Sequence, residues 1–237
     1  MFGFRRRERK SRTPTPFELP ASATPVFVAD DPASFSGDVG DVTPDEALAL
    51  LKAGNKAFVT GKGVLSQVTA KDLVSLQSSQ HPFAVIVACA DSRAPPNILF
   101  NQGLGRLFII RVAGNTIDRR GLASIVYAVE HLKCPIVVVM GHTGCGAVAA
   151  AEAVVDGRSE LESSIEEMII PILPAVLHVR AHGAPNQAVA AVEENARRVA
   201  ERLRTSETAL AKALVAGTLK VAAAVKDIHS GEVRFLD

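Results

Sequence analysis

The chain has 237 residues, of which 48% are apolar, so it can bury one large α/β domain or two small ones. Its net charge of +1 is uneven, because residues 5–12 carry a charge of +5 and the rest carries −4. We interpret the basic segment as a solvated arm and not as a nucleic-acid or lipid site. Three cysteines, an odd number, argue against a disulfide framework and favour a reducing, cytoplasmic setting.

The first 40 residues and the longest apolar run bear on location. Residues 1–40 are rich in proline, serine and charge without periodicity, so we expect a disordered or extended arm. A twin-arginine export signal fails, because the stretch 13–28 contains four prolines and a glutamate where an apolar segment is needed. The apolar run 168–179 is too short to cross a bilayer and is broken by two prolines. We expect a protein that is soluble and not exported.

Regular structure is expected to begin with a helix at residue 44. We expect Thr43 to be the N-cap, Pro44 the first helical residue and Glu46 the third. Thr43 and Glu46 then form a capping box ahead of an apolar series at helical spacing. A second short helix is expected over 69–78. Three runs rich in Val and Ile then predict buried strands: 84–88, 107–112 and 135–141.

The remaining segments favour helices and a hairpin. Apolar side chains recur at helical spacing behind a capping Asp118. The expected helices are 119–133, 145–156, 160–180 and 186–215. The C-terminal segment predicts two strands around Ser230 and Gly231. Strands that alternate with helices indicate an α/β fold: a central, mostly parallel β-sheet flanked by helices, with an N-terminal helical arm and a C-terminal edge hairpin.

Two short motifs directly follow two of the predicted strands. Cys89 comes after the first, and His142 and Cys145 come after the third. Because ligands bind at the carboxyl ends of parallel strands, neighbouring strands would bring these side chains together. Two thiolates and an imidazole suit Zn²⁺ and leave a fourth tetrahedral position for water. The 52 intervening residues favour a catalytic centre, and a structural zinc site or simply buried thiols are the alternatives.

Asp91 and Arg93 stand two and four residues after Cys89. A carboxylate there can coordinate the metal or orient a bound water, and the arginine can hold it away from the metal. An ordinary loop salt bridge is the alternative. Elsewhere, we expect Cys134 to be a core residue or a helix terminus. His178 and His182, four residues apart on a predicted helix, are expected to be exposed.

The motifs CADSR (89–93) and HTGC (142–145) resemble those of the β-class carbonic anhydrases, which carry Cys-x-Asp-x-Arg and His-x-x-Cys on successive strand ends. The resemblance covers roughly residues 43–237, and the plant-type branch is the nearest. It implies a zinc domain over 41–237, with zinc held by Cys89, His142 and Cys145 and catalysis by Asp91 and Arg93. Asp91 would become a fourth ligand in a closed state.

The same resemblance carries substrate-binding roles onto five further positions. Gln80 matches a glutamine that hydrogen-bonds substrate, Tyr127 an active-site tyrosine, and Gly146 the small residue after the second cysteine. Phe108 and Ala113 match an apolar pocket wall, although Ala113 is smaller than the family's frequent valine. The chain has no tryptophan, which the bicarbonate-inhibited branch uses in its regulatory site. Some of these groups come from a partner subunit in the family, so a homodimer or a higher homo-oligomer is expected.

Three functions follow as hypotheses. The first is zinc-dependent, reversible hydration of CO₂ to bicarbonate and a proton, with activity that rises above neutral pH because two thiolates make zinc a weaker acid. The second is a hydrolase of carbonyl sulfide or carbon disulfide on the same scaffold. The third is a catalytically silent structural zinc protein, against which the intact Asp91, Arg93 and Gln80 argue.

Overall fold

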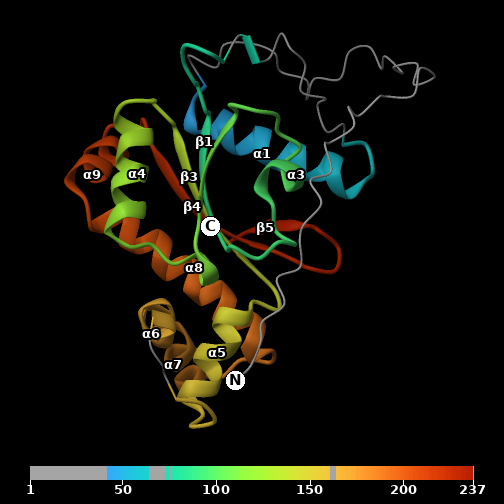
Figure 1. The fold of residues 1–237 in the computed structure, drawn as a ribbon, viewed down its shortest axis with the longest axis vertical. Coiled ribbons are helices and arrows are strands. Elements are labelled where there is room, and N and C mark those ends of the chain that lie inside the picture. Colours follow the sequence, from blue (N-terminus) through green and yellow to red (C-terminus); the bar gives the residue numbers. More distant parts are fainter. Residues whose placement is uncertain (1–41, 64–72, 75, 161–163, 237) are drawn as a thin grey trace, which may run out of the picture. The chain divides into compact units, whose positions relative to one another are not determined.

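The computed structural model describes residues 42–63, 73–74, 76–160 and 164–236, all of them in one unit of the chain, Pro32–Asp237 (Figure 1). The arm expected over residues 1–40 lies outside the described residues. So does half of the helix expected over 69–78; of its described residues, Leu73 and Val74 are helical and 76–78 form a turn and a bend.

A five-stranded sheet runs through the described region in the order β2-β1-β3-β4-β5. Its strands are β1 (Ala84–Ala88), β2 (Leu107–Arg111), β3 (Ile136–His142), β4 (Lys220–Lys226) and β5 (Val233–Phe235). The first four are parallel, and β5 pairs antiparallel with β4 as a hairpin. The α/β fold, the mostly parallel sheet and the edge hairpin are therefore confirmed.

Helices connect and cover these strands. They are α1 (Pro44–Val59), α3 (Pro96–Leu99), α4 (Arg119–Glu130), α5 (Gly146–Val155), α6 (Ser164–Ile169), α7 (Leu173–His182), α8 (Gln187–Thr205) and α9 (Thr208–Val215), with 3₁₀ turns η1 (Ala113–Asn115) and η2 (Ile170–Ile172). The predicted capping box opens α1: the Thr43 hydroxyl accepts the Glu46 N–H at 3.3 Å, and the Glu46 carboxylate accepts the Thr43 N–H at 2.8 Å.

Two of the predicted long helices are broken. The segment 186–215 forms two helices, because α8 stops at Thr205 and Ser206 and Glu207 lead into α9. The segment 160–180 is divided by the turn η2, which contains Pro171. Proline lacks an N–H and crowds the preceding turn, so in a helix interior it kinks or breaks the helix. Helical periodicity continued across both breaks and concealed them.

Each face of the sheet has its own core, because successive side chains of a strand point to opposite faces. Val85 and Val139 pack with side chains of α4, α8 and α9 on one face. Ile86 and Val138 pack with side chains of α1 and α3 on the other, and Figure 1 shows these helices on either side of the strands. Burial on both faces explains the continuous apolar runs of the sequence.

A third apolar cluster lies at the carboxyl ends of β1 and β3. It joins Cys89 and Cys145 to Val148 on α5, Val176 on α7 and Val192 on α8. The loops that carry the sequence motifs therefore rest on a packed apolar layer.

Candidate metal centre

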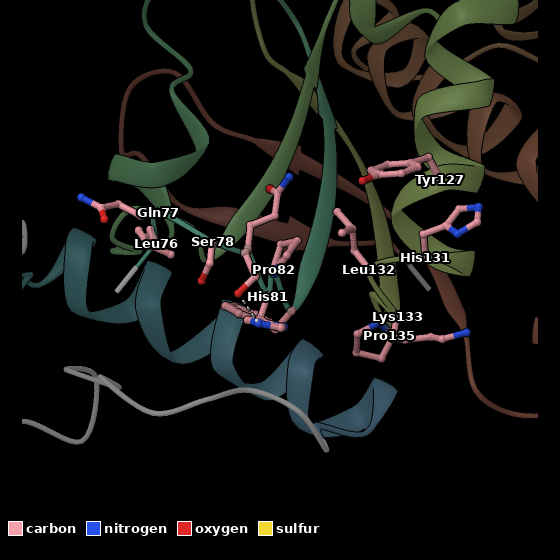
Figure 2. Close-up of a pocket in the computed structure, with 13 residues that line it drawn as sticks. Leu76, Gln77, Ser78, His81, Pro82, Tyr127, His131, Leu132, Lys133 and Pro135 are labelled. Carbon is pink, nitrogen blue, oxygen red and sulfur yellow. Dashed lines mark hydrogen bonds between the residues drawn. The ribbon is translucent and has the colours of Figure 1, made fainter. Parts of the chain in front are cut away.

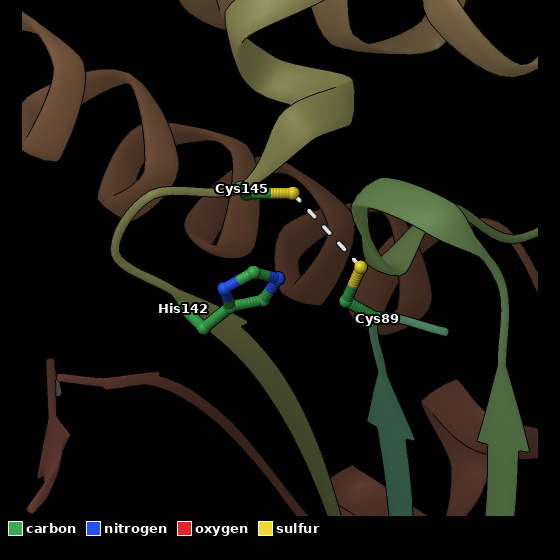
Figure 3. Close-up of side chains that lie close together, drawn as sticks. All are labelled: Cys89, His142 and Cys145. Atoms are coloured by element: carbon green, nitrogen blue, oxygen red, sulfur yellow. Dashed lines mark hydrogen bonds between the residues drawn. The ribbon is translucent and has the colours of Figure 1, made fainter. Parts of the chain in front are cut away.

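The three predicted ligands lie at the carboxyl ends of two neighbouring parallel strands. Cys89 follows β1 directly, and β3 ends at His142. Cys145 is the residue before α5. Figure 3 shows the three side chains converging, and their ligand atoms all lie within 4.8 Å of one another. All three residues are buried, and among the described residues they are the one group of three or more such side chains so placed.

The two sulfur atoms have the spacing that a tetrahedral metal requires. Two sulfurs that each lie about 2.3 Å from a tetrahedral zinc are about 3.8 Å apart. The Sγ atoms of Cys89 and Cys145 are 3.9 Å apart, and all three cysteines of the chain are free thiols. The spacing therefore suits two ligands of one ion, and it excludes a disulfide, whose sulfurs lie about 2.05 Å apart.

The His142 imidazole presents its second nitrogen to the same point. Nδ1 lies 3.0 Å from the Thr143 carbonyl, which fixes it as the N–H donor and leaves Nε2 with the lone pair. Nε2 is buried and has no hydrogen-bond partner among the described residues. A buried nitrogen without a partner is costly unless something else occupies its lone pair. A cation does so, and an S₂N donor set suits Zn²⁺.

Charge on the sulfurs is supported by backbone N–H groups. Asp91 N–H and Gly114 N–H donate to the Cys89 Sγ at 3.4 and 3.3 Å. Hydrogen bonding from Cys145 is the largest influence, and it lowers the pKa of Cys89 to about 3 against the effect of burial. The pKa of Cys145 is raised, because Cys89 carries the negative charge first and burial adds to the effect. A cation between the sulfurs would stabilise both as thiolates.

The Gly114 N–H reaches Cys89 because of the conformation of η1. Gly114 has a φ of 69°, and a Cβ at this position would lie 2.5 Å from Cδ1 of Ile172. Asn195, buried on α8, donates to the Gly114 carbonyl at 2.9 Å. A glycine is therefore needed at position 114, where its N–H contacts Cys89.

Asp91 and Arg93 form the predicted fork beside the ligands. Arg93 Nε donates to Oδ1 at 3.0 Å and Nη2 to Oδ2 at 2.8 Å, and the Arg93 backbone N–H also donates to Oδ1 at 2.9 Å. These bonds hold the pKa of Asp91 well below its usual range. Oδ2 of Asp91 lies 3.8 Å from Nε2 of His142. The carboxylate is thus paired with arginine and adjacent to the ligand cluster.

Two further cations contact the same turn, and sequence reasoning missed both. Arg111, at the end of β2, donates through Nε to the Cys89 carbonyl at 2.9 Å and through Nη2 to the Asp91 carbonyl. Lys226, at the end of β4, donates to the Arg93 carbonyl at 3.1 Å. Lys226 is only 4% exposed, and this burial lowers its pKa. A lysine at the end of the apolar run VAAAV was the one available signal.

Gln80 and Tyr127 lie together at the other end of the strands. Both line a hollow of about 790 Å³ whose wall includes Phe83, just before β1, and Pro135, just before β3. Figure 2 shows Tyr127, on α4, among the residues that line this hollow. The Phe108 ring lies 6.5 Å from the Tyr127 ring, between centroids.

These residues are therefore far from the metal ligands of their own chain. From Phe83 to Cys89 is six residues, and at about 3.3 Å per residue the span is about 20 Å. Ala113 and Gly146, by contrast, lie with the ligands: Ala113 packs on the cluster of Cys89 and Cys145, and Gly146 follows Cys145. One chain thus divides the predicted site residues into two separate groups.

Three further histidines and the third cysteine lie outside the ligand cluster. The His131 ring is tilted by 32° to the Tyr127 ring, with centroids 5.3 Å apart, and lines the same hollow; its position four residues after Tyr127 could have revealed this. His178 and His182 are exposed, as predicted. Cys134 is buried in the core, also as predicted, and its thiol donates to the Pro82 carbonyl at 3.1 Å. None of the described helices has the length and apolar character needed to cross a membrane.

Comparison with known proteins places the fold and the cluster in one family. The family model described as carbonic anhydrase matches residues 84–233. A carbonic anhydrase of Mycolicibacterium smegmatis is 36% identical over 194 residues, which cover 80% of this chain and 92% of that protein. The β-carbonic anhydrase CafA of Aspergillus fumigatus superposes with a TM-score of 0.63 at 30% identity, covering 81% of this chain and 91% of CafA.

One of the tetrameric β-carbonic anhydrases of Sordaria macrospora shares the fold, with a TM-score of 0.64 at 21% identity over 78% of this chain and 93% of that one. The family match, the parallel sheet and the Cys-His-Cys cluster at its carboxyl edge agree with one another. The chain belongs to the β-class carbonic anhydrases, a family of lyases.

Proposed function

We propose that the protein catalyses the zinc-dependent, reversible hydration of CO₂ to bicarbonate and a proton. The observation that carries this proposal is the Asp91 carboxylate, held by Arg93 at 3.8 Å from Nε2 of His142. A purely structural zinc site has four protein ligands and needs no such pair. Cys89, His142 and Cys145 would hold Zn²⁺, which when bound makes water acidic enough to supply hydroxide near neutral pH.

Asp91 orients the attacking oxygen. Because Arg93 keeps it ionised, its carboxylate can only accept hydrogen bonds, and it therefore fixes the direction of an O–H group near the ligands. The remaining lone pair of that oxygen is then directed at the substrate. If Arg93 releases Asp91, the carboxylate is close enough to the ligand cluster to become the fourth ligand and close the site.

The substrate would bind between two subunits. Gln80 and Tyr127 line a hollow about 20 Å from the ligands of their own chain, and Phe108 pairs with Val85 near the start of β1, so we assign all three to the site of a partner in a homodimer or higher homo-oligomer. Within the described region β2 pairs with β1 alone, and its partly exposed apolar side chains are typical of an edge that a second chain covers.

Each partner group then has a distinct task. The Gln80 amide would donate to an oxygen of CO₂ and afterwards of bicarbonate, and the rings of Phe108 and Tyr127 would form, with Ala113 and Gly146 of the other chain, a wall for an uncharged gas. His131, whose ring lies 5.3 Å from that of Tyr127, would accept the proton that hydration releases.

We place this reaction in the cytoplasm, because the three free cysteines suit a reducing compartment.

Carbonyl sulfide and carbon disulfide are the competing substrates, since they have the same linear, uncharged shape as CO₂. Stopped-flow measurement above neutral pH with each of the three substrates in turn distinguishes these possibilities.

The chain contains its own control for the role of Asp91. Asp156 and Arg158 have the same spacing and form an ion pair at the far end of α5 from Cys145, with Nη2 of Arg158 2.9 Å from Oδ2 of Asp156, which also pairs with Arg180. Asp91→Asn should abolish rapid CO₂ hydration while zinc content is unchanged, and Asp156→Asn should leave the rate as it was. Rapid hydration by Asp91→Asn, or none by the zinc-loaded parent, would contradict the proposal.

A further inference from the structure

The turn that carries Cys89, Asp91 and Arg93 is held by cations from both sides of β1. On the β2 side, Arg111 donates to the carbonyls of Cys89 and Asp91. On the other side, Lys226 extends from the end of β4, beyond β3, and donates to the Arg93 carbonyl at 3.1 Å. Arg111 fixes the start of the turn, and Lys226 fixes its end.

Lys226 also contacts the second ligand loop. In the β3–β4 register it is paired with His142, and its carbonyl accepts the Thr143 N–H at 3.0 Å. The Thr143 carbonyl is the group that orients the His142 ring. One residue therefore connects the Asp91–Arg93 turn to the backbone that positions an imidazole ligand.

The burial of Lys226 calls for an explanation. It is 4% exposed, although lysine is among the residues most rarely buried, and it lies near the like charge of Arg93. Burial removes water from the ammonium group, which is unfavourable. An apolar side chain of similar length, such as methionine, would occupy this strand end without that loss of hydration. Its hydrogen bond to the turn identifies what the ammonium group contributes.

The Arg93 side chain needs such support. It is 56% exposed, so packing does little to fix its guanidinium. The fork onto Asp91 depends on where the Arg93 backbone is placed, because all three Arg93–Asp91 hydrogen bonds are made within one short turn. A donor that anchors the Arg93 carbonyl therefore also restricts the fork.

We propose that Lys226 is a positioning residue: its ammonium group anchors the Arg93 carbonyl and so keeps the guanidinium paired with Asp91. This inference rests on the proposed function for its consequence in catalysis, but the anchoring itself is independent of activity. Lys226 touches no reacting atom; it acts through Arg93 and Asp91.

Three variants of β4 test the proposal. Lys226→Met keeps a long apolar side chain and removes the donor, and Lys226→Arg restores a charged donor. Lys220→Met is the matched control, because Lys220 begins the same strand and pairs with Asp45 at the surface. Each is purified with its zinc content and melting temperature recorded, and amide hydrogen exchange is followed by mass spectrometry on a peptide that spans residues 89–95.

Lys226→Met should raise exchange in this peptide at least about tenfold and lower kcat about 10- to 100-fold, with KM and zinc content close to the parent values. Lys226→Arg should recover most of both effects, and Lys220→Met should show neither. Unchanged exchange and kcat in Lys226→Met would overturn the proposal. If Lys226→Met does not fold, Lys226→Arg decides. It keeps a charged donor, so faster exchange and a lower kcat in folded Lys226→Arg would overturn the proposal, and parent values would support it.

The exchange measurement separates this inference from the proposed function. If the zinc-loaded parent hydrates no CO₂, the proposed function fails, and exchange in the three variants still decides whether Lys226 holds the turn. If the parent is active and Lys226→Met exchanges faster at full kcat, the turn is anchored by Lys226 but catalysis does not depend on it, and the positioning role is refuted.

Discussion

A site shared between chains should be restored by mixing two inactive variants. Asp91→Asn disables the group of residues around the ligands, and Gln80→Ala combined with Tyr127→Ala disables the group at the opposite end of the strands. About 20 Å separates the two groups within a chain, so no side chain can connect them there. In a dimer of one variant with the other, one site contains both defects and the second site contains neither.

The expected recovery follows from counting sites. Random pairing of equal amounts makes about half of the dimers mixed, and each mixed dimer has one intact site of two. The mixture should therefore show about a quarter of the parent CO₂ hydration rate, and mixed dimers isolated with two different affinity tags should show about half. If the site lies within one chain, both samples will show only the mean of the two variants, and the proposed interface is wrong.

Three further predictions concern thiols, packing and the proton. Burial raises the pKa of Cys134 to about 12, so at pH 8 it is protonated; iodoacetamide added to chelator-treated protein should label Cys89 first and Cys134 only after unfolding, as mass spectrometry can report. Gly54→Ala would place a Cβ 1.9 Å from the Phe100 carbonyl oxygen, so the free energy of unfolding in urea should fall by about 1–3 kcal/mol or more, and an unchanged midpoint would contradict this packing. His131→Ala should slow CO₂ hydration in dilute buffer and recover as buffer concentration rises; equal slowing at all buffer concentrations would exclude a role in proton transfer.

The clustering of Cys89, His142 and Cys145 could be predicted from sequence because it depends on residue type and strand order. Cys89 and His142 each follow a strand of unmistakable composition, and the carboxyl ends of adjacent parallel strands meet. The spacing of Asp91 and Arg93 likewise allowed their ion pair to be predicted, since the two residues lie in one turn. Contacts that follow from residue type and strand order alone could therefore be predicted from the sequence.

Contacts that depend on packing between distant segments could not be predicted. Lys226 reaches Arg93 only because β4 lies beside β3 and ends level with His142, which fixes a contact 133 residues apart in the chain. Gln80 was matched to the site by resemblance; the strand predicted between Gln80 and Cys89 already separated the two, and the fold showed that Tyr127 lies with Gln80 at the opposite end. The break between α8 and α9 was hidden because apolar periodicity continues through it.

Dependence on zinc is the central claim, and a metal titration tests it most directly. Protein freed of metal under reducing conditions is titrated with Zn²⁺, and CO₂ hydration is measured by stopped flow after each addition. The rate should rise in proportion to zinc and level off at about one ion per chain, because Cys89, His142 and Cys145 form the one such cluster in the described part of the chain, and Cys145→Ser should gain little. Hydration that is rapid before zinc is added, or absent at one bound zinc per chain, would contradict the account.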